Sequence, residues 1–393
     1  DDSQDAPYRV LHGEKAMYEG LIRKDPIDKD SIVVANLSCN SSKDRMDRNT
    51  LVKSLRVIDP DLIFFAGDQH YDHTEHTAGW IMWGVQFRDI TKDRPTVTLP
   101  DDHDVGHGNL WGEGGIKATK IGNSGGYIYD AEYVKQVERC QTSHLPDAYD
   151  PTPVAQGIGV YYTTYQLGGI DFAIIEDRKF KSGPGGKISH SNKRVDHIID
   201  PNFDPKTIDV PGLVLLGERQ LKFLDQWSHN WEGVTMKAVL SQSPFFAASH
   251  IHGGGDPVKN RLYGDLDSNG WPQAGRNKAL RIMRKGFACH LTGDQHLATL
   301  AQHGIDEYND GPWSLVSPSI VGKVYGRRWH PVSEKAGANA DPDSPLQWTG
   351  EYLDAFHNKV TMHAYANPDK VLKGSGFVVA RFDKKNHTIT AEC

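Results

Sequence analysis

The sequence predicts a layered α/β fold in which helices cover two central β-sheets. Short apolar runs that suit buried strands alternate with helical stretches in the N-terminal part, and further strands dominate the rest of the chain. Of the 393 residues, 38% are hydrophobic, which suffices for a sizeable core, and no Pro/Gly-rich linker divides them. We therefore expect one domain at residues 31–393, preceded by a polar N-terminal extension at 1–30.

The expected elements follow one another in a regular order. A strand at 31–39, a helix at 45–57 and a strand at 62–66 form a βαβ unit, because parallel neighbours need a crossover of this length. Partial apolar spacing predicts a short helix at 13–23. The other expected elements are helices at 80–91, 216–227 and 279–285, a hairpin of strands at 159–167 and 169–176, and strands at 96–100, 237–241, 288–292, 313–317, 376–382 and 387–391.

Three long segments are expected to be loops. Residues 105–127 are rich in glycine but contain no GxGxxG or Walker pattern, so a nucleotide phosphate loop is rejected. Residues 182–212 and 328–373 are polar excursions whose Gly, Pro and charged residues favour turns.

Bulk properties narrow the function classes. The net charge of −7 supplies no basic field, so a stable nucleic-acid complex is not expected. No apolar run reaches the roughly 18 residues of a transmembrane helix, and four cysteines without a CxxC pair make no disulfide framework. The first residue is Asp1 rather than Met, as in a processed chain, so the missing signal peptide does not argue against secretion. The oligomeric state stays open.

Several expected strands end in a side chain that can bind a metal. Gly-Asp-Gln-His follows the strand at 62–66, with a tyrosine at 71, and the same four letters recur at 293–296 after another apolar run. Cys39 and the Asp101–Asp102 pair also follow strands. Chemistry in open α/β sheets gathers beyond the carboxyl ends of strands. This mixture of thiolate, carboxylate, imidazole and phenol suits two metals about 3.5–4 Å apart.

These motifs resemble those of the PhoD-like alkaline phosphatase/phosphodiesterase family of calcineurin-type metallophosphoesterases. Residues 67–71 fit its GDxxY motif, residues 101–105 resemble its DDHEV segment, and residues 293–296 fit GDVH. Further matching pieces lie at 36–39, 176–181, 216–227, 241–245 and 269–271. The resemblance implies a four-layer metallophosphoesterase fold, with two central mixed β-sheets flanked by helices and loop insertions near 182–212 and 328–373.

The resemblance also implies a ligand set. Asp68 would bridge both metals, with Cys39, Tyr71 and His296 completing the first, which is typically Fe³⁺. Asp102 and Asp294 would hold the second, typically Ca²⁺. Thiolate and phenolate suit a transition metal and an all-oxygen set suits calcium, with Zn²⁺ or Mn²⁺ as alternatives.

The implied activity is hydrolysis of small phosphate esters by a metal-bound hydroxide. His103, held by a partner such as Asp104, would protonate or stabilise the leaving oxygen, and Arg178 would clamp the phosphate. The family's asparagine pair after DDHEV is replaced here by residues 106–109, which makes His107 and Asn109 candidate contacts of the substrate or of a metal. The family resemblance places such an enzyme in the periplasm or outside the cell.

Other interpretations remain at this stage. The same fold could act on a phospholipid, a nucleotide diester or a sulfate ester, or serve as a non-catalytic metal- or glycan-binding protein. Taken alone, Cys39 is a small buried hydrophobe, Tyr71 a packed aromatic residue, and Arg178 half of a surface ion pair. By default, the other histidines near the motifs are interpreted as solvated loop residues: His70, His73, His76, His250 and His252.

Overall fold

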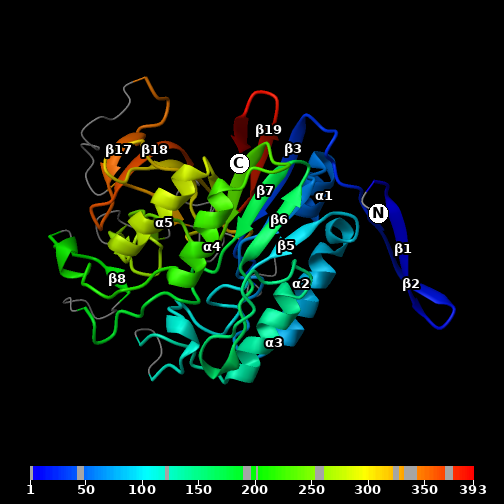
Figure 1. Cartoon of the computed structure of the whole chain (residues 1–393), viewed down its shortest axis with the longest axis horizontal. Coiled ribbons are helices and arrows are strands. Elements are labelled where there is room, and N and C mark those ends of the chain that lie inside the picture. The colour runs from blue at the N-terminus through cyan, green and yellow to red at the C-terminus, as the bar shows by residue number, and fades with distance from the viewer. Residues whose placement is uncertain are drawn as a thin grey trace.

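Two mixed β-sheets pack face to face at the centre of the molecule, and helices lie on their outer sides (Figure 1). The four-layer architecture expected from the sequence is therefore confirmed. The computed structural model describes residues 3–41, 48–119, 124–188, 196–200, 202–252, 261–321, 327–331, 343–367 and 375–393.

The larger sheet has eight strands, in the order β17-β18-β14-β15-β13-β9-β7-β6. Its central strands β7, β9, β13 and β15 run parallel, and the outer strands pair antiparallel. The strands are β6 (Thr163–Leu167), β7 (Ile170–Ile174), β9 (Met236–Leu240), β13 (Cys289–Thr292), β14 (Ala298–His303), β15 (Trp313–Val316), β17 (Gly350–Leu353) and β18 (Lys359–Ala366).

The smaller sheet has five strands in the order β20-β19-β3-β4-β5. Strands β3, β4 and β5 are parallel, whereas β19 pairs antiparallel with both β3 and β20. Their bounds are β3 (Ser31–Leu37), β4 (Leu62–Phe65), β5 (Thr96–Thr98), β19 (Val378–Asp383) and β20 (Thr388–Glu392).

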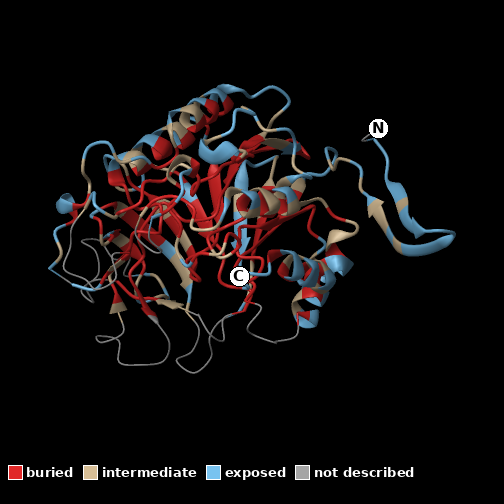
Figure 2. Ribbon diagram, turned by 90° about the horizontal axis from the view of Figure 1, so that it is seen from below, coloured by how far each residue is buried: buried red, intermediate tan, exposed pale blue. Residues whose placement is uncertain are grey.

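Side chains from both sheets share one core. Ile32, Val34 and Phe64 of the smaller sheet belong to the same buried cluster as Phe172 and Leu240 of the larger sheet. Removing this apolar surface from water is the main force that holds the two sheets together. Figure 2 shows the buried residues concentrated in the sheets and on the inner faces of the helices.

The helices close the outer faces. Helices α1 (Asn49–Ile58) and α2 (His76–Thr91) pack on the smaller sheet through Leu55, Phe87 and their neighbours. Helices α4 (Glu218–His229) and α5 (Gln273–Lys285) cover the larger sheet. Apart from an N-terminal hairpin, the other elements in the described part of the chain are α3 (Ala131–Thr142), the 3₁₀ turns Glu113–Gly115, Ala155–Gly157 and Pro205–Thr207, and the short strands β8 (His197–Ile198), β10 (His250–His252), β11 (Arg261–Leu262), β12 (Gly264–Asp265) and β16 (Arg327–Trp329).

The expected helix at 13–23 is wrong. The segment lies in an exposed hairpin of β1 (Ala6–His12) and β2 (Lys15–Ile22), which projects from the body near the N-terminus (Figure 1). Gly13 adopts φ +61° at the turn, which glycine does readily and which starts a hairpin rather than a helix. The Tyr18 hydroxyl donates to a backbone carbonyl of α2 at 2.9 Å, so the hairpin contacts the body.

Some elements of the structure were not expected from the sequence. The chain has a helix at α3 and strands at β14, β17 and β18 that the sequence did not indicate. A register shift between Leu300 and Ala301 interrupts the pairing of β14 with β18, and such a bulge breaks the alternation by which strands are recognised. The first residues of the expected helix at 45–57, and parts of the expected loops at 105–127, 182–212 and 328–373, lie outside the described residues.

Among the residues described by the structure, none of the helices is long and apolar enough to cross a membrane.

Candidate metal centre

Strands of both sheets deliver polar side chains to one edge of the sandwich. Cys39 follows β3, Asp68 follows β4, Asp101 follows β5 and Asp294 follows β13. Parallel strands end at the same edge, so their following loops meet. The loops are joined by backbone hydrogen bonds, including Cys39 N–H to the Gly67 carbonyl at 3.1 Å.

Four candidate ligands adopt left-handed backbone conformations. Cys39, Asp68, Asp294 and His296 have φ values of +60°, +58°, +61° and +55°. Non-glycine residues rarely adopt this region, and such strained residues cluster at functional sites. Gly67 (φ +117°) has no alternative, because a Cβ atom there would lie 2.4 Å from Asp101 Cβ.

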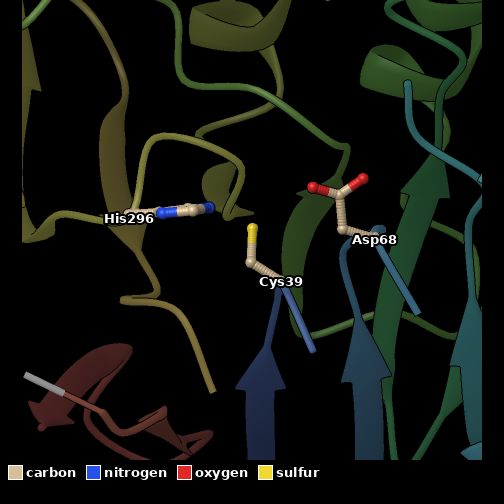
Figure 3. Close-up of side chains that lie close together, drawn as sticks. All are labelled: Cys39, Asp68 and His296. Carbon is tan, nitrogen blue, oxygen red and sulfur yellow. The ribbon is translucent and has the colours of Figure 1, made fainter. Parts of the chain in front are cut away.

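The first group of donor atoms comes from Cys39, Asp68 and His296, which point toward one another (Figure 3). The Sγ, carboxylate and imidazole donor atoms all lie within 4.8 Å of one another. The hydroxyl of Tyr71 joins them, 2.8 Å from Asp68 Oδ2 and 3.2 Å from His296 Nε2. The four ligands expected for the first metal therefore lie together.

Two further groups of donor atoms continue from the first, the second sharing Asp68 with it and the third sharing Asp102 with the second. Asp68, Asp102 and His103 form one, and Asp101, Asp102 and Asp294 form the other, each within the same 4.8 Å limit. Asp68 and Asp102 thus each belong to two groups, which suits two neighbouring cations. Asp102 Oδ1 is buried without a hydrogen-bond partner, and a buried carboxylate oxygen of this kind fits a cation ligand.

The site concentrates negative charge in a buried place. Burial, followed by repulsion from Asp102 and Asp101, raises the pKa of the Asp68 carboxyl well above its usual range. Burial also raises the pKa of the Cys39 thiol and of the Tyr71 phenol well above their ordinary values. Burial opposes ionisation of Asp102 as well, but His103, Arg178 and a backbone N–H lower its pKa to about 2. Bound cations would offset this repulsion and favour the charged forms.

Arg178 is buried, with its side chain 3% exposed, and its donors are occupied. Nε and Nη2 bond to Asp101 at 2.6 and 3.3 Å, Nη1 bonds to the carbonyl and the carboxylate of Asp267, and Nη2 pairs with Asp294 at 3.1 Å. Each of the three guanidinium nitrogens therefore has a carboxylate partner within the protein. In this arrangement Arg178 offsets acidic charge and is a buried residue, not a surface one, while its expected contact with a phosphate stays a prediction.

His103 is oriented by His73, not by Asp104 as expected. His73 Nε2 lies 2.7 Å from His103 Nδ1. The His103 ring stacks on the ring of Tyr71, and the two ring centroids are 4.1 Å apart. The Asp104 carboxylate instead accepts backbone N–H groups of Asp68, Gln69 and Asp101 at 2.8–3.0 Å. Asp104 therefore ties two ligand loops together.

Asn109 and His107, the two candidate substrate contacts, form hydrogen bonds with other groups of the protein. Asn109 donates its backbone N–H to Asp102 Oδ2 at 2.6 Å and its amide to Asp196 at 2.7 Å. His107 Nε2 accepts the Ile128 N–H at 3.1 Å. Burial lowers the pKa of His107 to about 4, which keeps the ring neutral and able to accept this bond.

Sequence reasoning missed several supporting residues. Ser243 Oγ donates to Asp294 Oδ2 at 2.5 Å, and the Gln295 amide donates to the same oxygen at 2.7 Å. Ser243 and Gln295 lie inside two of the family motifs, at 241–245 and 293–296, and this position could have indicated their supporting role. Contrary to the loop interpretation, three of the histidines are buried: His70, His76 and His250. Residues 253–255, next to His252, lie outside the described part of the chain.

No protein-family model matches the sequence, and no curated protein matches it significantly. Solved structures do match the fold. A structure of PhoD superimposes with a TM-score of 0.61 at 14% identity, covering 97% of this chain and 70% of that chain. A purple acid phosphatase from yellow lupin (Lupinus luteus) seeds superimposes with a TM-score of 0.51 at 13% identity, and the match covers 97% of this chain and 55% of the phosphatase chain. The chain thus has the metallophosphoesterase fold of PhoD and purple acid phosphatase, as the sequence resemblance predicted.

Proposed function

We propose that this protein is a phosphoric ester hydrolase of PhoD type, an alkaline phosphatase/phosphodiesterase that works with two metal cations. The observation that carries the proposal is the set of three donor groups in which Asp68 and Asp102 are shared. Two cations held there by Asp68 and Asp102 would polarise the phosphoryl oxygens and would lower the pKa of a bound water to about 7. The fold, common to phosphatases, supports this reaction class.

The first cation is assigned to Cys39, Asp68, Tyr71 and His296. A thiolate, a phenolate and an imidazole favour a transition metal, and we propose Fe³⁺, with Zn²⁺ or Mn²⁺ as alternatives. The buried thiol and phenol must lose their protons to bind, so loading should release protons. The hydrogen bond from Tyr71 to Asp68 already brings both oxygens together.

The second cation is assigned to Asp68, Asp102 and Asp294. Carboxylate oxygens alone favour a hard cation, and we propose Ca²⁺. Ser243 and Gln295 hold one oxygen of Asp294, and Asn109 holds one oxygen of Asp102. These bonds fix the direction of the carboxylates, and partners of this kind typically change metal affinity about 10- to 100-fold.

His103 is assigned as the acid that protonates the leaving oxygen. Its side chain is 24% exposed although the adjacent Asp102 is buried, so the ring is reachable from solvent. The contact with His73 occupies Nδ1 and leaves Nε2, 3.8 Å from Asp102, as the nitrogen that faces the donor groups. A positioned histidine of this kind contributes roughly 10²–10⁴-fold to rate.

The proposed substrate is a small phosphate ester, and the proposed location is the periplasm or the extracellular space. The location rests on the family resemblance of the motifs. The proposal of catalytic activity rests on the donor groups and can be tested whatever the location of the protein.

Hydrolysis of 4-nitrophenyl phosphate and bis(4-nitrophenyl) phosphate, together with elemental analysis of the purified protein, tests the proposal. The wild type should hydrolyse at least one ester and carry two metals. Asp68→Asn should lose activity and both metals, whereas Asp28→Asn, the same change at an exposed side chain, should lose neither. A metal-loaded wild type inactive on both esters would contradict the proposal.

A further inference from the structure

A series of polar contacts extends from the donor groups into the surrounding loops. Asn109 links Asp102 to Asp196 through bonds of 2.6 and 2.7 Å. Asp196 and Asp265 both lie 3.7 Å from Nε2 of His197, where β8 pairs with β12. This side of the site is therefore acidic, with one histidine between two carboxylates.

An arginine also lies close to the donor groups. Gln295 donates to Asp294 Oδ2 at 2.7 Å and accepts from Arg327 Nη1 at 3.1 Å. One glutamine side chain thus separates the guanidinium from a candidate metal ligand. Arg327 opens β16 and is only partly exposed, and its charge stabilises the ionised form of Asp265.

Arg327 differs from Arg178 in how its charge is used. Arg178 has three carboxylate partners, and each of its nitrogens contacts at least one of them. Within the described chain, no carboxylate lies within 4.0 Å of Arg327, and its buried Nε has no hydrogen-bond partner. A buried guanidinium N–H without a partner is costly unless a ligand satisfies it.

The geometry of the guanidinium indicates which ligand would satisfy it. The bond to Gln295 uses Nη1, which leaves the edge formed by Nε and Nη2. Two N–H groups on one edge match two oxygens of a phosphate, and such paired charge-assisted bonds are strong. The Gln295 side chain bonds to both Arg327 and Asp294. It therefore fixes the position of the guanidinium relative to the donor groups.

We infer that Arg327 is the residue that binds the non-bridging oxygens of the substrate phosphate, and that it favours phosphate monoesters. This inference rests on the proposed function. A monoester dianion offers three terminal oxygens and two negative charges, whereas a diester offers two oxygens and one charge. Arg327 therefore stabilises the bound monoester more than the bound diester.

The test compares Arg327→Gln and Arg327→Lys with Arg328→Gln. Arg328 is the next residue of the same strand, and its side chain points to the opposite face. For each protein, kcat/KM is measured on 4-nitrophenyl phosphate and bis(4-nitrophenyl) phosphate, and binding of inorganic phosphate to the metal-loaded protein is measured by calorimetry. Metal content and thermal unfolding are recorded for every variant.

Arg327→Gln should lower monoester kcat/KM and phosphate affinity on the order of 10- to 100-fold, as loss of charge-assisted bonds predicts. Diester kcat/KM should fall several-fold less, Arg327→Lys should be intermediate, and Arg328→Gln should match the wild type. Unchanged phosphate affinity in Arg327→Gln with normal metal content would overturn the inference, as would equal loss on both esters. A wild type that hydrolyses neither ester would contradict the proposed function, and the phosphate-binding comparison would still decide the role of Arg327.

Discussion

The hydroxyl of Tyr71 lies 2.8 Å from Oδ2 of Asp68, three residues earlier in the same loop, and 3.2 Å from Nε2 of His296. These contacts bring a phenol, a carboxylate and an imidazole to one point, beside the Cys39 thiol. Such a set holds a transition metal once the phenol ionises. The relationship explains why a tyrosine, and not His70 of the same motif, completes the group.

Replacing Tyr71 with phenylalanine should remove the colour of an iron-loaded protein. Phenolate bound to Fe³⁺ absorbs visible light, and phenylalanine keeps the packing of the ring while removing the oxygen. The measurement is the visible spectrum of wild type and variant at matched iron content. A variant that retains both its iron and the visible band would show that Tyr71 is not a ligand.

Replacing Cys39 with serine should weaken binding of the transition metal more than binding of calcium. A thiolate gives way to a poor neutral ligand, while the carboxylates assigned to the second cation are unchanged. Elemental analysis after dialysis against a weak chelator measures both metals in one sample. Equal retention of the two metals would contradict the assignment of Cys39.

Replacing His73 with phenylalanine should lower kcat about 10-fold without loss of metal. His73 Nε2 fixes Nδ1 of His103 at 2.7 Å, and phenylalanine keeps the ring contact but removes that bond, as for other outer-shell partners of histidine. For comparison, His103→Asn should cost roughly 10²–10⁴-fold. Wild-type kcat in His73→Phe would mean that another contact orients His103.

Replacing Arg178 with glutamine should destabilise the protein by about 3–5 kcal/mol, the cost of leaving buried charges without a partner. Asp101, Asp267 and Asp294 all depend on this guanidinium. Arg219→Gln, at a partly exposed ion pair with Asp150, should cost at most about 1 kcal/mol. Chemical denaturation measures both. A stable Arg178→Gln with only a raised KM would restore the role of Arg178 as a phosphate clamp.

Acid should destabilise the fold through a buried histidine that belongs to none of the three donor groups. His290 lies between Ser241 Oγ at 2.7 Å and Ser314 Oγ at 2.9 Å, and burial lowers its pKa from 6.5 to about 3. The unfolded chain then binds the proton more tightly than the folded chain, so stability is present above pH 6.5 and is lost as the pH falls toward 3. At pH 5 the loss from this residue is about 2 kcal/mol relative to pH 7.

Denaturation curves of His290→Asn between pH 7 and 5 test this prediction. Asparagine cannot titrate in this range, so the free energy of unfolding should depend less on pH than in the wild type, whatever the change in its absolute value. An unchanged pH slope would mean that His290 is not the group responsible.

Much of the site could be predicted because its signals are local. Cys39, Asp68 and Asp294 follow buried strands within three residues, and parallel strands bring their ends to one edge. The role of Arg178 could not be predicted, because it depends on Asp101 and Asp267, which approach only when both sheets are assembled.

The misassigned parts of the fold have a similar origin. The hairpin at β1 and β2 was expected to be a helix because Met17, Leu21 and Ile22 have partial helical spacing. The turn at Gly13 and the cross-strand pairing outweigh that weak local pattern. His73 appeared to be a solvated loop residue because the ring it contacts, His103, belongs to a different strand end.

Element-specific anomalous X-ray scattering on crystals of the native protein identifies each metal and its ligands in one experiment. We expect two peaks, one from a transition metal bound by Cys39, Asp68, Tyr71 and His296, and one from calcium bound by Asp68, Asp102 and Asp294. A single metal, or two metals that do not share Asp68, would contradict this assignment.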